Sequence, residues 1–259
     1  VGGKNINDRA LVKTLVDNSA DAVAWVGSIG ANLSSVGFAG GASTKRIHRP
    51  VDAEGKMLSV GSYLVPLMEK VCKDNGVEII FNAPVTEILT KDGAAVGVKA
   101  EGYTVNAKAV VVATGGFGAN LDMVAQINPK LKGFVTTNAP GITGDGIKMA
   151  QVIGADVVDM DQIQIHPTVE QKSSSLITEG LRGDGAILIN AEGKRFFDEV
   201  STRDKVSAAV LAQTGSYAYL IVDQAMVDES KVIQGYISSG FTVEGTDTAK
   251  LAEAIGVPA

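Results

Sequence analysis

Hydrophobic residues recur at helical spacing in several stretches of the chain. Residues 8–27 place apolar side chains on one helical face, and Asp8 stands where a helix cap is expected, so the pattern predicts a helix from Asp8 to Trp25. A second helix is predicted over residues 62–75, where Gly76 ends it. The same spacing predicts shorter helices over residues 147–153, 205–213, 226–232 and 248–255.

Short apolar, β-branched runs between these helices predict strands. They cover residues 77–81, 83–89, 96–100, 108–113 and 217–223, with a turn at Asp92-Gly93 and a candidate edge strand over residues 241–243. The run Lys108–Ala113 is continuously apolar after its lysine, which is typical of a strand buried on both faces. Residues 157–165 read as extended. Helices and strands that alternate in this way predict an α/β (α+β) fold.

Glycines follow the run that ends at Ala113. Gly115 and Gly116 would let a ligand approach the backbone at the carboxyl end of a strand, although a tight strand-to-helix connection would use the same residues. A second glycine turn, residues 141–146, opens the helix predicted at Ile147. Asp145 in that turn either accepts a hydrogen bond from a ligand hydroxyl or caps the helix.

The stretch from His166 to Arg203 gathers one histidine, acids and several arginines among glycines and apolar residues. Buried arginines are rare unless they are paired or contact an anion, so this stretch is a candidate site. The alternative is a structural ion-pair network of Glu179, Arg182 and Arg203. Residues 37–50 leave a similar choice, between a surface loop with a solvated charge run and an approach for an anion or cofactor.

Composition removes several classes of function. The chain of 259 residues carries a net charge of −6 with both signs interspersed, so it lacks the basic surface that nucleic acid binding needs. No apolar run approaches the ~20 residues of a membrane helix. The single cysteine, Cys72, excludes an intrachain disulfide and a Cys-rich metal site, and two histidines disfavour a multi-histidine zinc site. We therefore expect no metal centre in this chain.

Several of these pieces, in this order, resemble the flavoprotein subunit of the fumarate reductase/succinate dehydrogenase superfamily, and most closely the soluble flavocytochrome c-type fumarate reductases. The shared pieces are Gly2-Gly3-Lys4-Asn5-Ile6-Asn7-Asp8, Gly40-Gly41-Ala42-Ser43, Arg46, His48-Arg49-Pro50, Ala113-Thr114-Gly115-Gly116-Phe117, Thr143-Gly144-Asp145-Gly146 and the block from His166 to Arg203.

The resemblance implies a Rossmann-like FAD-binding domain, partial here, over residues 1–161, and a partial mixed α+β capping domain over residues 162–259, with the active site between them. The Gly-x-Gly-x-x-Gly that opens such an FAD domain is absent from the chain. The C-terminal part of the family, with a second substrate histidine and arginine, is also absent. We therefore expect an internal fragment of a longer flavoprotein.

The resemblance also implies roles for individual residues. FAD would lie against Val85 (through its backbone, on the adenine side), Ala113, Gly115, Gly116 and Asp145. His166 and Thr178 would hold a substrate carboxylate with Glu179 beside them, Arg203 would donate the proton, and Glu179 and Arg182 would reprotonate it. Arginine is a poor acid in water, with a pKa above about 12, so this role requires dry surroundings and nearby cations.

The implied reaction is reduction of fumarate to succinate, with hydride from flavin N5 and a proton from Arg203. The electron donor would be a haem domain, another flavin domain or a quinol partner, in bacterial anaerobic respiration, with a periplasmic location for a flavocytochrome c-like protein and a cytoplasmic one as the other choice. Alternatives are reduction of another unsaturated acid such as urocanate, steroid dehydrogenation, aspartate oxidation, or a folded fragment without catalysis. An NAD-linked enzyme is disfavoured because no dinucleotide-binding motif is present.

Overall fold

The computed structural model describes residues 5–37, 44–53 and 58–258. The chain divides into two compact units, residues 1–81 and residues 82–259, which are described separately below. The motif pieces Gly2-Gly3-Lys4 and Gly40-Gly41-Ala42-Ser43 lie outside the described residues. The domain boundary predicted after residue 161 falls inside the second unit and stays a prediction.

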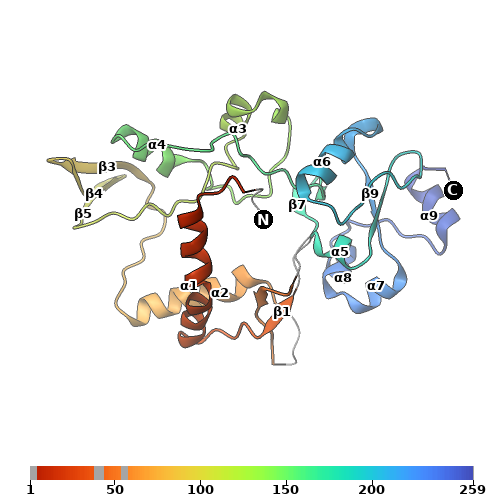
Figure 1. The fold of residues 1–259 in the computed structure, drawn as a ribbon, viewed down its shortest axis with the longest axis horizontal. Coiled ribbons are helices and arrows are strands. Elements are labelled where there is room, and N and C mark those ends of the chain that lie inside the picture. The colour runs from red at the N-terminus through yellow and green to blue at the C-terminus, as the bar shows by residue number, and fades with distance from the viewer. Residues whose placement is uncertain (1–4, 38–43, 54–57, 259) are drawn as a thin grey trace. The chain divides into compact units, whose positions relative to one another are not determined.

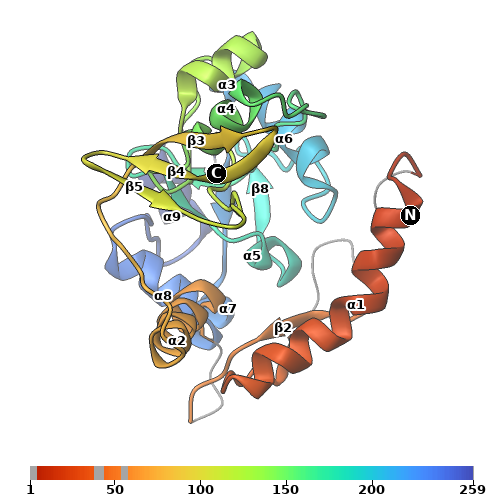
Figure 2. The ribbon, with the colours of Figure 1, turned by 90° about the vertical axis from the view of Figure 1, so that its left-hand side faces the viewer.

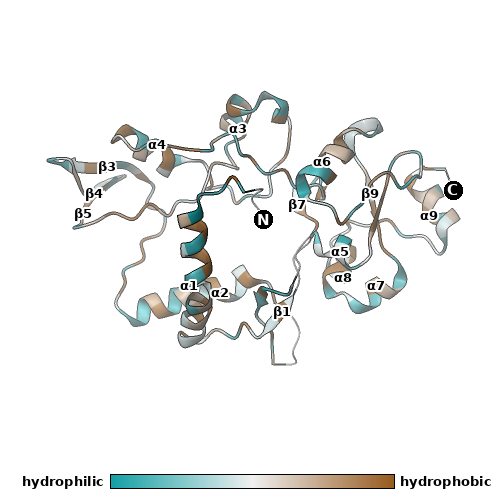
Figure 3. Ribbon diagram, viewed as in Figure 1, coloured by the Kyte–Doolittle hydropathy of each residue, from teal (hydrophilic) through white to brown (hydrophobic). Residues whose placement is uncertain are grey.

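The first unit contains both long helices that the sequence predicted. Helix α1 (Arg9–Ser28) is capped by the carboxylate of Asp8, which accepts from the backbone N–H groups of Ala10 at 2.7 Å and Leu11 at 3.1 Å. Helix α2 covers Val60–Asp74. Apolar and polar residues alternate around α1 (Figure 3), yet none of its residues is buried, and Trp25 is 55% exposed.

Residues His48 and Arg49 lie in a small hairpin. Strand β1 (Ser35–Gly37) pairs antiparallel with β2 (Ile47–Arg49), so that Arg49 lies opposite Ser35. Residues 77–81, predicted as a strand, form none: no described segment pairs with them, and Ile80 and Phe81 are exposed. A β-branched run becomes a strand only where a neighbour completes its hydrogen bonds.

The second unit begins with a three-stranded antiparallel sheet, seen in Figure 2. Strand β3 (Val85–Lys91) and β4 (Ala94–Ala100) confirm two predicted strands, and the turn between them uses positive φ at Asp92 and Gly93, as predicted. The third strand, β5 (Tyr103–Asn106), was not predicted.

The prediction for Lys108–Ala113 was wrong in this structure. The run forms no ladder with any described segment, and Val111 is 88% exposed instead of buried on both faces. All sheets among the described residues are antiparallel and come from other segments. An apolar run favours a strand that is buried in a sheet, but the run itself does not determine whether partner strands lie beside it.

Two helices flank the second glycine turn. Helix α3 (Leu121–Ile127), which was not predicted, is capped by Asn120. After the 3-10 turn η1 (Pro129–Leu131), helix α4 (Asp145–Val152) begins two residues before the predicted start at Ile147, and Gly154 follows it. Residues 157–165 form no strand, with a turn at residues 160–161.

The C-terminal part of the second unit, whose elements Figure 1 labels, contains two hydrophobic clusters of buried residues. Leu188, on β8 (Ile187–Ile189), packs with Val206 and Val210 of helix α6 (Arg203–Leu211), and β8 pairs antiparallel with β9 (Tyr219–Ile221). Strand β9 and helix α6 confirm predicted elements. A second cluster places Leu181 of α5 (Gly180–Gly183) against Ala186 and Ile233.

The remaining elements complete this unit: β6 (Val169–Glu170) paired with β7 (Ser175–Leu176), the 3-10 turn η2 (Thr214–Ser216), α7 (Gln224–Glu229), α8 (Lys231–Ser238) and α9 (Thr248–Ile255). Helix α9 matches its prediction. The helix predicted over residues 226–232 is interrupted at Ser230, which caps α8, and residues 241–243 form no strand. The fold class is mixed α/β, as predicted. None of the described helices has the length and apolar character that crossing a bilayer requires.

Candidate active site

The second unit brings three of the predicted site residues together. His166 lies on the segment before β6, Glu179 is the N-cap residue of α5, and Arg203 is the first residue of α6. Thr178 and Glu179 occupy the short link between β7 and α5, so the hairpin of β6 and β7 fixes where they enter the site. Among the residues that the structure describes, no three His, Cys, Asp or Glu side chains gather as a metal site would need.

The carboxylate of Glu179 lies at the centre of this arrangement. His166 Nε2 is 2.8 Å from Glu179 Oε2, and Arg203 donates to the same oxygen from Nε at 3.1 Å and to Oε1 from Nη2. Because an ionised carboxylate only accepts hydrogen bonds, Nε2 of His166 must carry a proton. Nδ1 of the ring accepts from the backbone N–H of Thr168 at 3.3 Å, which holds the imidazole in place.

Burial and hydrogen bonding act in opposite directions on Glu179. Burial alone would raise the pKa of its carboxyl group, but the hydrogen bonds from Arg203 and His166 outweigh burial and hold the pKa of Glu179 below its usual value. Glu179 is therefore a carboxylate at neutral pH in this arrangement, and losing one of its two hydrogen-bond partners would raise its pKa.

Arg182 is held in a different way. Its side chain is 5% exposed, and Nη1 donates to the backbone carbonyl oxygen of Glu199 at 2.6 Å, while Nε has no hydrogen-bond partner among the described residues. Burial, reinforced by the nearby charge of Arg203, lowers the pKa of Arg182 below its usual value, although Glu179 and Glu199 act against the shift. Of the three residues in the ion-pair alternative, Glu179 and Arg203 form the ion pair, whereas Arg182 rests on a backbone carbonyl.

Thr178 is anchored by a residue that the sequence did not single out. Its backbone N–H donates to the hydroxyl of Tyr236 at 3.1 Å, and that hydroxyl donates to the carbonyl oxygen of Leu176 at 3.3 Å. Tyr236 comes from α8, about sixty residues away along the chain, so no local pattern could reveal this contact.

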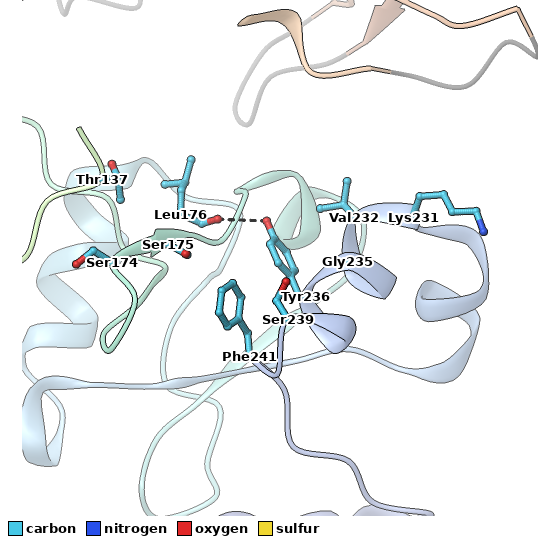
Figure 4. Close-up of a pocket in the computed structure, with 10 residues that line it drawn as sticks. All are labelled: Thr137, Ser174, Ser175, Leu176, Lys231, Val232, Gly235, Tyr236, Ser239 and Phe241. Carbon is cyan, nitrogen blue, oxygen red and sulfur yellow. Dashed lines mark hydrogen bonds between the residues drawn. The ribbon is translucent and has the colours of Figure 1, made fainter. Parts of the chain in front are cut away.

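Tyr236 also lines an open pocket of about 500 Å³, where its ring lies near Phe241 (Figure 4). The residues around the pocket are Thr137, Ser174, Ser175, Leu176, Lys231, Val232, Gly235, Tyr236, Ser239 and Phe241. The pocket thus borders the segment that carries Thr178.

Gln164 was also missed. Its Oε1 accepts from Arg203 Nη1 at 2.5 Å. Gln164 stands two residues before His166 in a segment that forms no strand, so no local pattern indicated this contact.

The glycine loop predicted for the cofactor lies against the start of α4. The backbone N–H of Gly144 donates to the carbonyl oxygen of Gly116 at 3.1 Å. A Cβ at Gly146 would come within 2.1 Å of Thr114 Oγ1 and 2.7 Å of Val112 Cγ1, so α4 packs directly on the segment before the loop. A Cβ at Gly116 would meet nothing within 4 Å. The backbone at Gly116 is therefore open, which fits a cofactor that lies against it.

Asp145 is not the helix cap. The N-cap of α4 is Gly144, with φ of 82°, and Asp145 is the first helical residue. Its Oδ2 accepts from the hydroxyl of Thr143 at 2.8 Å, which shows that this carboxylate is placed to accept from a hydroxyl group. Val85 opens β3 opposite Ala100, with a register irregularity directly after it. Its contact with the adenine side, like the contacts of Ala113 and Gly115, stays a prediction.

Most of this chain matches a known protein family and known proteins. Residues 1–254 match the FAD binding domain family. The chain is 43% identical over 262 residues to "Fumarate reductase (cytochrome)" of Shewanella frigidimarina, with 99% of this chain and 45% of the relative covered. It is 42% identical over 261 residues to "NADH:fumarate oxidoreductase" of Klebsiella pneumoniae (strain 342), with 99% and 28% covered.

A solved structure agrees with the sequence relatives. The open conformation of a flavocytochrome c3 fumarate reductase superposes with a TM-score of 0.82 at 38% identity, covering 99% of this chain and 46% of that one. The chain thus spans less than half the length of these relatives. The chain belongs to the FAD binding domain family, and FAD is its cofactor.

Proposed function

We propose that the protein containing this chain reduces fumarate to succinate with Arg203 as the proton donor. The observation that carries this proposal is the linked set of His166, Glu179 and Arg203, in which one carboxylate contacts a histidine and an arginine. The names of two similar proteins, a fumarate reductase and an NADH:fumarate oxidoreductase, support fumarate as the substrate.

FAD, held by the backbone of Val85, Ala113, Gly115 and Gly116 and by Asp145, would supply a hydride to one carbon of the double bond. The residues of the site supply the rest. An N–H of the Arg203 guanidinium gives its proton to the other carbon. Glu179, once it has itself received a proton, would pass one to that guanidinium, and the contact of its Oε1 with Nη2 of Arg203 supports this transfer. The added hydride and proton together convert the alkene to the saturated acid.

Burial, together with the nearby charge of Arg203, lowers the pKa of Arg182, so Arg182 would give up a proton more readily than an arginine in water. In the proposed relay, Arg182 passes a proton to Glu179, and Glu179 passes one to Arg203. The contact between Glu179 and Arg203 supports the second transfer, and the electrostatic influence of Glu179 on Arg182 supports the first.

His166 and Thr178 would grip one carboxylate of the substrate. The N–H at Nε2 of His166 faces Glu179, so a substrate carboxylate that accepts from this N–H would take away one of the two hydrogen-bond partners of Glu179. Loss of that partner raises the proton affinity of Glu179 at the moment when the relay needs it to carry a proton. Substrate binding and the proton relay are thereby coupled through a single carboxylate.

The electrons would come from a donor domain or partner protein outside this chain. The names of the relatives point to two kinds of donor, a cytochrome and NADH. A bacterial source is consistent with both relatives.

The test is turnover of fumarate by the whole flavin-loaded protein with a reduced dye as electron donor. Arg203→Ala should lower kcat by about 10²–10⁴-fold, because general acid catalysis contributes about that much. The matched control is Arg9→Ala, on the exposed first turn of α1, and it should not change turnover. If the unaltered protein reduces urocanate or another unsaturated acid in the same panel but not fumarate, the substrate proposed here is wrong.

A further inference from the structure

Glu199 is a buried carboxylate to which neither the sequence nor the proposed reaction assigns a role. Its residue is 2% exposed, and its side chain accepts from the backbone N–H of Leu188 at 2.9 Å. Arg195 donates to both of its oxygens, from Nε at 2.8 and 3.1 Å and from Nη2 at 2.6 Å. Four donor contacts from β8 and Arg195 therefore fix the position of this one side chain.

The backbone of the same residue holds Arg182. Nη1 of Arg182 donates to the carbonyl oxygen of Glu199, and this is its only hydrogen bond to a described residue, since Nε has none. No carboxylate of a described residue forms an ion pair with Arg182. The placement of the buried guanidinium thus depends on where that carbonyl oxygen lies.

We propose that Glu199 is a positioning residue for Arg182. Hydrogen bonds from Leu188 and Arg195 to its carboxylate fix the position of residue 199, and with it the carbonyl oxygen that accepts from Arg182. In this way Glu199 would keep the Arg182 guanidinium close to Glu179. This inference rests on the proposed proton relay for its effect on turnover, but not for its effect on local structure. Glu199 contacts neither substrate nor cofactor in this account.

Substitution of Glu199 by Gln in the whole flavin-loaded protein tests the proposal. Glutamine keeps the acceptor for Leu188, but its neutral amide loses the charged, two-oxygen contact with Arg195. We expect kcat for fumarate to fall about tenfold with little change in KM, because one weakened buried contact corresponds to roughly that factor. Asp198→Asn, which alters the exposed neighbouring carboxylate, should leave kcat unchanged. An unchanged kcat in Glu199→Gln overturns the proposal.

A combined variant separates positioning from general loss of stability. With Arg182→Gln already present, Glu199→Gln should lower kcat no further, since the residue that it positions has been removed. A multiplicative loss in the double variant would show that Glu199 acts on turnover by another route, which overturns the proposal. If Glu199→Gln does not fold, Arg195→Gln takes its place in both measurements.

Hydrogen exchange supplies a result that does not depend on turnover. Glu199→Gln should speed exchange of the backbone amides near Arg182 and Leu188, and Asp198→Asn should not. If the unaltered protein fails to reduce fumarate but this exchange pattern appears, the reaction proposed above is wrong while the positioning role stands. Unchanged exchange at both segments overturns the positioning role.

Discussion

In the proposed reaction, Glu179 would take part both in substrate binding and in proton transfer. It accepts from a histidine and an arginine, and burial and hydrogen bonding shift its pKa in opposite directions. The pKa of such a carboxylate rises when either hydrogen-bond partner is lost. A proton relay that is triggered by substrate binding would require this response. Arg182, in contrast, is buried and donates to a neutral carbonyl oxygen, and burial lowers its pKa.

The lowered pKa of Glu179 predicts how stability depends on pH. A carboxyl group whose pKa is lower in the folded state than its ordinary 4.5 stabilises the fold fully above that value, and the contribution is lost as pH falls through the folded pKa. Glu179→Gln removes this contribution. The stability difference between the unaltered protein and the variant should therefore be largest near about pH 7 and shrink below about pH 4.5, as measured by urea unfolding at several pH values.

An exposed side chain that does not titrate serves as the control for this measurement. Thr104→Ala, on β5, should give a stability difference that does not change over the same range. A difference for Glu179→Gln that grows as the pH falls would contradict the assigned hydrogen bonds, because it would require a pKa raised by burial.

The hydroxyl of Tyr236 provides a second prediction for a single side chain. Tyr236→Phe keeps the ring beside Phe241 but removes the acceptor for the backbone N–H of Thr178. Loss of one such contact costs about 1 kcal/mol, so KM for fumarate should rise several-fold as Thr178 shifts. Steady-state kinetics of the whole protein measure this, and Tyr103→Phe on β5, which should have no effect, is the matched control. An unchanged KM would show that Thr178 is held without the tyrosine.

Among the secondary-structure elements, α4 packs on the segment that leads into the glycine loop. Gly146 allows this because any Cβ there would overlap Thr114 and Val112. Gly146→Ala should therefore push α4 away, destabilise the unit by about 1–3 kcal/mol and lower the FAD content of the purified protein. Gly141→Ala is the matched control, since a Cβ there meets nothing within 4 Å. Flavin absorbance per protein in the two variants decides the matter, and equal flavin content would contradict this account of the loop.

Elements were predictable where their determinants are local. A capping side chain and a helical period were enough for α1, and α9 came out at its predicted bounds, with Asp247 as its cap. The strand predicted over residues 108–113 does not form, because a strand also needs partner strands, and its own sequence does not specify them. The site divides in the same way: His166, Glu179 and Arg203 were identified through a family resemblance, whereas Tyr236 and Glu199 depend on contacts that the sequence does not reveal.

For the molecule as a whole, burial differs sharply between its two units. Neither α1 nor α2 buries a single residue. The second unit contains two described hydrophobic clusters, around Leu188 and around Leu181, and all the proposed catalytic residues lie in it. Because buried apolar surface is the main source of folding free energy, the two units should differ in their ability to fold independently.

This contrast predicts the outcome of separating the units at Phe81 and Asn82. Residues 82–259 should unfold cooperatively on their own, because both hydrophobic clusters and the ion pair of Glu179 with Arg203 remain intact. Residues 1–81 should show no cooperative transition, since helices without a buried face are marginal in water. Circular dichroism during heating distinguishes the two, with Leu188→Ala in residues 82–259 as an internal check, expected to cost about 2–5 kcal/mol. A cooperative transition in residues 1–81 would mean that this unit has a source of stability beyond the burial seen here.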